Sequence, residues 1–287
     1  MSASELLIHP ITERQLVAFQ QAPSHALLVV GPAGSGKFSL ATQLAEAMLE
    51  LKPGAFETYS YGSIIRSDAG KAIGIEAVRT LEHFLSLKIP GNQLPNRVVV
   101  IENSHLLSVE AQNALLKTLE EPVEGAVIIL TASHPQALLP TIRSRVHTIP
   151  VHQPDRTTIE HYFIRQGYNK TVVQRALAIS GGLPGLMQAL LAESDHPLLA
   201  ATEKARALLS QPLHERLLHV DELSKDRAQS QAVIFILGQM AHQGIQNAQG
   251  AAINKWQVIQ RSSYEANEAL RNNGQPKLVL LNLALHL

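Results

Sequence analysis

The stretch ALLVVGPAGSGK, at residues 26–37, decides the fold class of this chain of 287 residues. Residues 26–30 form a short apolar run typical of a buried strand, and after the glycine-rich turn the apolar residues from Leu40 to Leu51 have helical spacing. A strand, a glycine loop and a helix in this order begin a βα unit. The stretch therefore predicts an α/β fold built on a parallel sheet.

The glycine-rich turn has the spacing of a phosphate-binding loop, since four residues separate Gly31 from Gly36 and Lys37 follows directly. Glycines in such a loop, with Gly34 here between them, let backbone N–H groups face phosphate oxygens at a helix N-terminus, and the lysine meets the β and γ phosphates. A plain glycine turn between a strand and a helix is the alternative interpretation. Phe38 departs from the pattern, because serine or threonine at this position would offer a hydroxyl to Mg²⁺.

Glu102 follows a second apolar run, VVVI at residues 98–101, which is suited to a central parallel strand. A P-loop enzyme that hydrolyses nucleotide needs one carboxylate for Mg²⁺ and a second to orient the attacking water. Asn103 stands at the second position, and an amide cannot take a proton. We expect a nucleotide site that holds ATP or ADP only weakly and does not turn it over. The alternative is that Glu102 is a solvated residue after a buried strand.

The remaining pattern of the first half alternates between strands and helices, which indicates an α/β sandwich. Two apolar runs predict further strands, and a weaker stretch lies between the first two helices. The predicted strands are 126–132 and 146–151, the weaker stretch is 56–65, and the predicted helices are 75–87, 108–119 and a short turn at 136–139.

Two prolines, Pro150 and Pro154, mark a domain boundary, because no convincing strand follows them. Three short helices are expected next, and the rest of the chain is helical with a few loops. The predicted helices are 157–166, 171–179 and 183–191, and the loops lie near Gln211, 243–249 and 272–276. The expected domains are 1–152, 153–196 and 197–287.

The amino-acid composition argues against several classes of protein. Lys plus Arg and Asp plus Glu both number 24, so the net charge is zero, which argues against a surface that binds nucleic acid over its whole extent. The absence of cysteine excludes disulfides, thiol nucleophiles and cysteine-ligated zinc. No apolar run approaches the roughly 18 residues of a membrane span, and the N-terminal residues lack the layout of a secretory signal. A cytoplasmic location is expected.

No metal site is expected either. His214 and His219 flank a glutamate and look like a metalloprotease signature, but they are five positions apart. On a helix this spacing separates the two rings by about 140°, so they cannot share one ion.

Arg143 and Arg145 alternate around a serine in TIRSRV, at residues 141–146, just before the last predicted strand. If this segment is extended, the two side chains face opposite sides. Taken alone, both are as easily explained as surface arginines.

Three runs carry a resemblance: NALLKTLEEP at 113–122, ILTASHP at 129–135 and LLPTIRSR at 138–145. They resemble the clamp-loader AAA+ subunits of the replication factor C and DNA polymerase III type, and most closely the delta-prime branch of that family. The likeness extends to 73–87, 180–190 and 270–285, and so covers nearly the whole chain. It implies an AAA+ module over 1–152, a three-helix lid over 153–196 and a helical collar over 197–287 that packs with other subunits.

The resemblance gives Arg145 a role. In this family the arginine of an SRC motif is a finger that reaches a neighbouring subunit's ATP, and Val146 here replaces the cysteine of that motif. Delta-prime subunits also carry altered nucleotide sites, in agreement with Phe38, Asn103 and the lack of a sensor arginine in 180–186.

The implied function is that of a largely non-hydrolysing clamp-loader subunit. Its implied partners are gamma/tau-type and delta-type subunits, the sliding clamp and primed DNA. No zinc is expected, because the cysteine module that many delta-prime proteins hold after the first helix is missing from residues 49–59. The alternative is an autonomous AAA+ motor ATPase like the gamma/tau subunits. A small-molecule P-loop kinase is disfavoured, because nothing after residue 150 resembles a substrate lid.

Overall fold

The computed structural model describes residues 6–67, 71–87, 95–192, 198–271 and 273–287. It divides into two compact units, Met1–Pro154 and Asp155–Leu287, which are described separately. Among the described residues, none of the helices is both long and apolar enough to cross a membrane.

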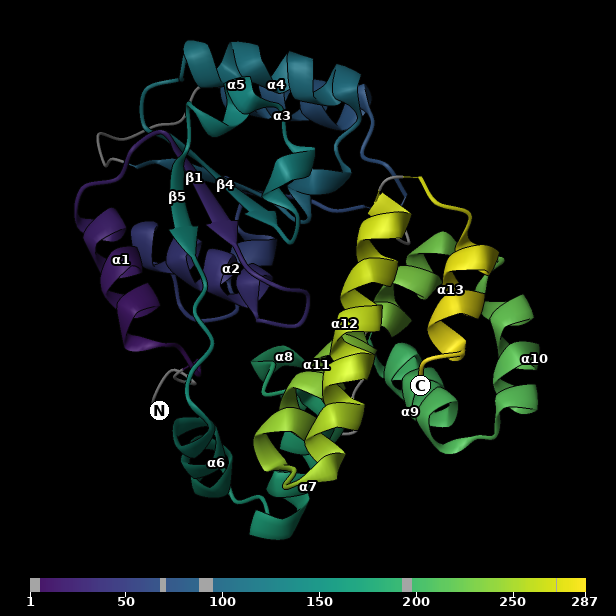
Figure 1. Ribbon diagram of the computed structural model, residues 1–287. Coiled ribbons are helices and arrows are strands. Elements are labelled where there is room, and N and C mark those ends of the chain that lie inside the picture. Colours follow the sequence, from purple (N-terminus) through teal and green to yellow (C-terminus); the bar gives the residue numbers. More distant parts are fainter. Residues whose placement is uncertain (1–5, 68–70, 88–94, 193–197, 272) are drawn as a thin grey trace. The chain divides into compact units, whose positions relative to one another are not determined.

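The first unit is built on a five-stranded sheet in the order β2-β3-β4-β1-β5, with every pairing parallel (Figure 1). The register places the ends of β1, β3 and β4 at one edge, since Val30 pairs with Ala132 and Ile101 with Leu130. The strands are β1 (Ala26–Val30), β2 (Gly62–Ile65), β3 (Arg97–Ile101), β4 (Ala126–Ala132) and β5 (His147–Pro150). The sheet confirms the predicted α/β fold class.

Helices cover both faces of this sheet: α1 and α2 lie on one face, and α3, α4 and α5 on the other (Figure 1). Alternate residues of a strand therefore enter different cores, and Val98 and Val99 belong to opposite clusters. The helices are α1 (Pro10–Gln21), α2 (Lys37–Met48), α3 (Ile75–Ser86), α4 (Val109–Glu120) and α5 (Pro140–Arg143). Short 3-10 turns form η1 (Phe56–Thr58), η3 (Ser104–Leu106) and η4 (Pro135–Ala137).

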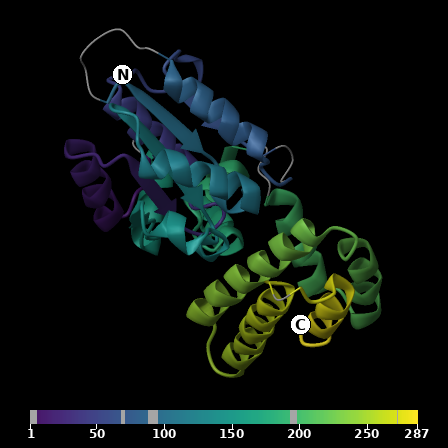
Figure 2. The ribbon, with the colours of Figure 1, turned by 90° about the horizontal axis from the view of Figure 1, so that it is seen from above.

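The described part of the second unit consists of helices joined by loops and turns. Its longest helices, α11 and α12, pack side by side (Figure 2). Helix α11 also packs on α7 and α9. The helices are α6 (Arg156–Arg165), α7 (Lys170–Ser180), α8 (Pro184–Ala192), α9 (Leu199–Ser210), α10 (Leu213–Leu223), α11 (Arg227–Asn247), α12 (Ala251–Arg271) and α13 (Pro276–Ala284). The predicted boundary between 196 and 197 falls in 193–197, outside the described residues, and stays a prediction.

One predicted loop is wrong. Residues 243–247 continue α11 instead of forming the start of a loop, and the chain leaves the helix only after Asn247. Within this part of α11, Gly244 lies directly against the indole of Trp256 on α12, where a Cβ would stand 2.3 Å from the ring. The glycine thus serves close packing between the two helices.

Candidate functional site

The phosphate-loop sequence forms a tight turn between β1 and α2. Gly34 and Gly36 have φ angles of 77° and 82°, the left-handed region that glycine adopts without strain. A Cβ on Gly31 would stand 3.0 Å from the Oγ of Ser35 and 3.1 Å from the Cβ of Val151, so a side chain has no room there. Since the Ser35 hydroxyl is buried without a hydrogen-bond partner in the structure, it is a polar group directed into the loop.

Lys37 folds back over this loop. Its Nζ donates a hydrogen bond of 2.7 Å to the carbonyl oxygen of Pro32, and the residue is only 6% exposed. Burial lowers the pKa of Lys37 to about 8, and the Glu102 carboxylate opposes that shift. The ammonium is therefore held inside the site, next to the loop and within the field of one carboxylate.

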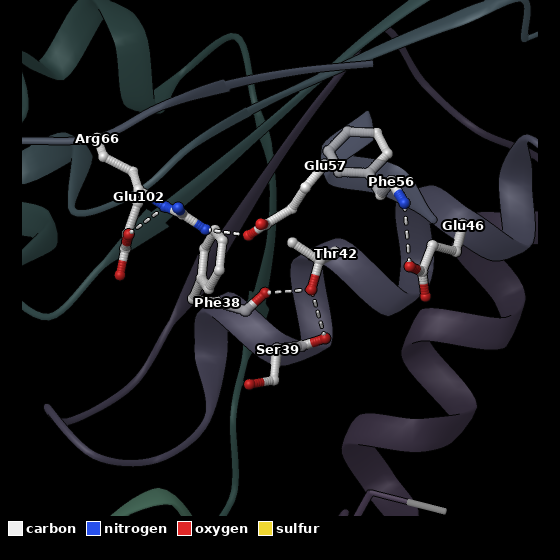
Figure 3. Close-up of polar contacts among 8 residues, drawn as sticks. All are labelled: Phe38, Ser39, Thr42, Glu46, Phe56, Glu57, Arg66 and Glu102. Carbon is white, nitrogen blue, oxygen red and sulfur yellow. Dashed lines mark hydrogen bonds and ion pairs between the residues drawn. The ribbon is translucent and has the colours of Figure 1, made fainter. Parts of the chain in front are cut away.

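The carboxyl ends of β2 and β3 bring Arg66 and Glu102 together, because Arg66 follows Ile65 and the N–H of Glu102 donates to the Ile65 carbonyl. The guanidinium of Arg66 forms ion pairs with Glu57 and with Glu102, the latter at 3.4 Å between Nε and Oε2 (Figure 3). Its Cζ also lies 4.7 Å from the centre of the Phe38 ring, as expected for a cation–π contact.

This cluster does not fit Mg²⁺. Phe38 supplies a ring where the ion would need a hydroxyl, and Glu102 already has Arg66 as its cationic partner. Burial raises the pKa of Glu102, against the opposing effects of Arg66 and Lys37. One turn further along α2, the Thr42 hydroxyl donates to the carbonyls of Phe38 and Ser39 and is thus bonded within its own helix (Figure 3).

Asn103 lies beside Glu102 in the left-handed conformation, with φ of 51°, and its N–H donates to the Thr131 hydroxyl at 3.0 Å. The residue that replaces a water-orienting acid therefore shapes the turn after β3. Two histidines that are not among the predicted site residues also meet here: the rings of His105 and His134 lie 5.4 Å apart. Each comes two to four residues after one of two neighbouring strands, a signal that the sequence contained.

His105 is neutral at physiological pH, because burial, His134 and Lys37 together lower its pKa to about 4. Its Nδ1 accepts a hydrogen bond of 3.4 Å from the N–H of Ser133. It can therefore order the turn after β4, but it does not add a cation. Across the described residues, no group of three or more His, Asp or Glu side chains could hold a metal ion.

Arg145 lies in a different part of the first unit. Its Nη2 stands 2.8 Å from Oε1 of Glu120, the last residue of α4, and its Nη1 donates to the Thr141 carbonyl at 3.0 Å. The side chain of Arg145 is 37% exposed, and the residue directly precedes Val146 and the edge strand β5. The segment is not extended, since Pro140–Arg143 is helical and its C-cap is also in the helical region, so the condition for the two arginines to face opposite sides is not met. Arg143 is exposed on that short helix.

Gln112 of α4 fixes the segment that carries Arg145. Its amide is buried, donates to the carbonyls of Leu107 and Ala137, and accepts from the N–H of Leu139 at 2.7 Å. Leu139 is the N-cap of α5, so this side chain holds the start of the helix against α4. Arg145 is thus placed by α4 and α5.

Known proteins resemble the chain in sequence. A family model described as "DNA polymerase III, delta subunit" matches residues 11–155. The DNA polymerase III subunit delta' of Pseudomonas aeruginosa is 32% identical over 58% of this chain and 56% of its own length, and that of Bacillus subtilis is 30% identical over 50% and 46%. The subunit tau of Bacillus subtilis is 36% identical over 46% of this chain and 25% of its own length.

The chain spans about half the length of the delta' relatives it matches. Among solved structures, a gamma-subunit-related protein of DNA polymerase III from Thermotoga maritima aligns with 96% of this chain and 98% of its own length. Its TM-score is 0.48 at 19% identity.

Proposed function

Because the chain belongs to the delta-prime clamp-loader family of DNA polymerase III, we propose that it is a clamp-loader subunit that does not itself hydrolyse ATP. In this proposal it completes the loader ring beside gamma/tau-type and delta-type subunits, in the cytoplasm. The ring then places the sliding clamp on primed DNA. The proposal has two parts, an inactive site of its own and an arginine supplied to a neighbour.

The observation that carries the first part is the contact of Phe38, Arg66 and Glu102. Hydrolysis needs a divalent ion that bridges the β and γ phosphates and an acid that orients water. Here the ion's hydroxyl ligand is replaced by a ring, the remaining acid is paired with a guanidinium, and Asn103 cannot accept a proton. Each loss alone would impair turnover, and together they support a subunit without ATPase activity.

The second part concerns Arg145. A guanidinium stays charged at any working pH, and its planar fork matches the oxygens of a transferring γ-phosphoryl group. Arg145 lies partly exposed next to the edge strand β5, and among the described residues its side chain is held by the exposed pair with Glu120 and by bonds to its own turn. It can therefore turn towards a neighbouring subunit without rearrangement of the core.

The exposed leucines of the second unit support an assembly role. Leu278 and Leu285 of α13 and its C-terminal end are more than half exposed, as is Leu218 of α10, the helix against which α13 packs. Exposed leucines on two helices that pack together offer apolar surface to a partner subunit.

The test uses the assembled loader with its clamp and primed DNA. Arg145→Ala should leave assembly intact and lower the stimulated ATPase rate, because a finger of this kind contributes roughly 10³–10⁵ to one site of several. Arg145→Lys should restore little, since a point charge cannot reproduce the fork. Arg143→Ala is the matched control, and equal small effects of both alanine variants would refute the finger.

The alternative is an autonomous motor ATPase, favoured by the 36% identity with a tau subunit. Phosphate release by the pure chain separates the two functions. We expect no release in the presence of Mg²⁺ and ATP. Steady release that Lys37→Ala abolishes would establish the motor instead.

A further inference from the structure

Arg66 has hydrogen-bonding capacity beyond its two carboxylate contacts. A guanidinium carries five N–H donors in a rigid plane. In the structure, one edge of the plane meets Glu102 and another meets Glu57, and one face covers the ring of Phe38 (Figure 3). Only the contact with Glu57 is a hydrogen bond, from Nη2, and the pair with Glu102 is an ion pair at 3.4 Å, so a cation with further N–H donors is held at the end of β2.

The loop at residues 31–37 retains the features of an anion site. The Ser35 hydroxyl is buried without a partner in the structure, and the N-terminus of α2 favours negative charge. The ammonium of Lys37 is bonded to a neutral carbonyl of the same loop. A phosphate oxygen is the stronger acceptor for an ammonium, because that hydrogen bond joins two charges.

The two cations belong to one electrostatic cluster. Arg66 and Lys37 both act on Glu102, and both lower its affinity for a proton. One carboxylate therefore faces two cations that come from different segments. Glu57, on the far side of Arg66, is more than half exposed and its charge is screened by water.

We propose that the guanidinium of Arg66 takes the place of the divalent ion, so that the loop at residues 31–37 binds ADP or ATP as the metal-free anion. This inference rests on the proposed function, and it adds which ligand the non-hydrolysing site binds. Mg²⁺ brings no advantage here: it finds no hydroxyl at Phe38, it competes with Arg66 for Glu102, and it neutralises the phosphates that Arg66 and Lys37 attract.

The experiment is a calorimetric titration of the full chain with ADP and with ATP, once in EDTA and once in excess Mg²⁺. We expect both nucleotides to bind in EDTA, with a Kd equal to or below the value in Mg²⁺. Binding that is lost in EDTA, or weakened there by more than about threefold, overturns the proposal. So does the absence of binding in both buffers.

Variants identify Arg66 as the cation. Arg66→Gln should raise the Kd in EDTA by about tenfold or more, the effect of losing a hydrogen bond between charged groups. Arg79→Gln is the matched control, because Arg79 is also an exposed arginine paired with a glutamate but belongs to α3. If the two variants raise the Kd equally, Arg66 acts only through the net charge of the protein, and the assignment is overturned.

A double variant tests directly whether the guanidinium of Arg66 replaces Mg²⁺. Phe38→Thr with Arg66→Gln restores the hydroxyl and frees Glu102, so nucleotide binding should become dependent on Mg²⁺. Thermal unfolding checks that each variant is folded, and binding in the double variant that still ignores Mg²⁺ contradicts the proposal. The result is independent of the Arg145 experiment, which measures ATP hydrolysis by a neighbouring subunit, so each idea can fail alone.

Discussion

Glu120 holds the guanidinium of Arg145 at 2.8 Å, and Glu120→Gln removes that ion pair while keeping the size of the side chain. The two side chains are 51% and 37% exposed, so water screens the attraction. Exposed pairs of this kind contribute about 0.2–1 kcal/mol. Glu120 also ends α4, where a negative charge is unfavourable with the helix dipole by a similar amount. The two effects oppose each other, and the free energy of unfolding should change by less than about 1 kcal/mol.

The functional effect follows from the same numbers. If Arg145 must leave Glu120 to reach a neighbour's nucleotide, the pair is a tether that costs about 0.2–1 kcal/mol at each engagement. Its removal should raise the stimulated ATPase rate of the assembled loader by about 1.4- to 5-fold, since 1.4 kcal/mol corresponds to a factor of ten. The gain should shrink in high salt, which screens the pair in the unchanged protein as well.

The assay compares three loaders, with the unchanged chain, Glu120→Gln, and Glu120→Gln combined with Arg145→Ala. The double variant should have the low rate of Arg145→Ala alone, because the glutamate acts only through the arginine. A rate below that of the unchanged loader for Glu120→Gln refutes the tether and makes Glu120 a residue that aims Arg145.

Two further predictions concern stability. The pKa of Lys37 is about 8 in the folded chain and 10.5 as its ordinary value, so the unfolded chain binds more protons between these pH values and folding stability rises with pH there. This rise amounts to about 3 kcal/mol, and Lys37→Met should remove it. The measurement is the free energy of unfolding in urea at pH 7.5 to 10.5. If this free energy depends on pH in the same way in both proteins, the prediction is contradicted. Gly244→Ala should destabilise the second unit by about 1–3 kcal/mol, because the new methyl group overlaps the Trp256 ring. Trp256 is the one tryptophan in the sequence, so its fluorescence reports the unfolding of this unit. An unchanged unfolding midpoint would show that α11 and α12 can move apart at no cost.

The strands were predictable because a parallel sheet covered on both faces imposes continuous apolar runs, and residues 26–30 and 126–132 match β1 and β4. Helix α1 escaped prediction because its apolar residues do not mark its buried face: Ile11 and Val17 are exposed. Thr12 stands at a fully buried position of that helix, where its hydroxyl donates to the Pro150 carbonyl and accepts from the N–H of His152. A polar residue that serves the core through hydrogen bonds leaves no hydrophobic pattern to detect.

The candidate site likewise contains residues that the sequence predicts and residues that it does not. The loop at residues 31–37 and Glu102 were predictable, because glycine spacing and the end of an apolar run are local signals. Arg66 was not, because its role depends on the pairing of β2 with β3, and β2 is only half-buried and weakly apolar. Glu57 reaches the same guanidinium from a 3-10 turn nine residues earlier, a contact that no spacing rule anticipates.

The geometry explains how a chain of this family can lose one activity and keep another. Phe38, Arg66 and Glu102 follow β1, β2 and β3, and the ion pairs and the ring contact of Arg66 join these three residues to one another and to Glu57 of the η1 turn. Arg145 instead depends on Gln112 and Glu120 of α4, through the bonds that fix α5. Because the two sets share no hydrogen bond or ion pair in the described residues, substitutions at residue 38 or 103 leave the placement of Arg145 unchanged. Loss of hydrolysis in the chain's own site is thus compatible with an arginine that serves a neighbour, as the proposed function requires.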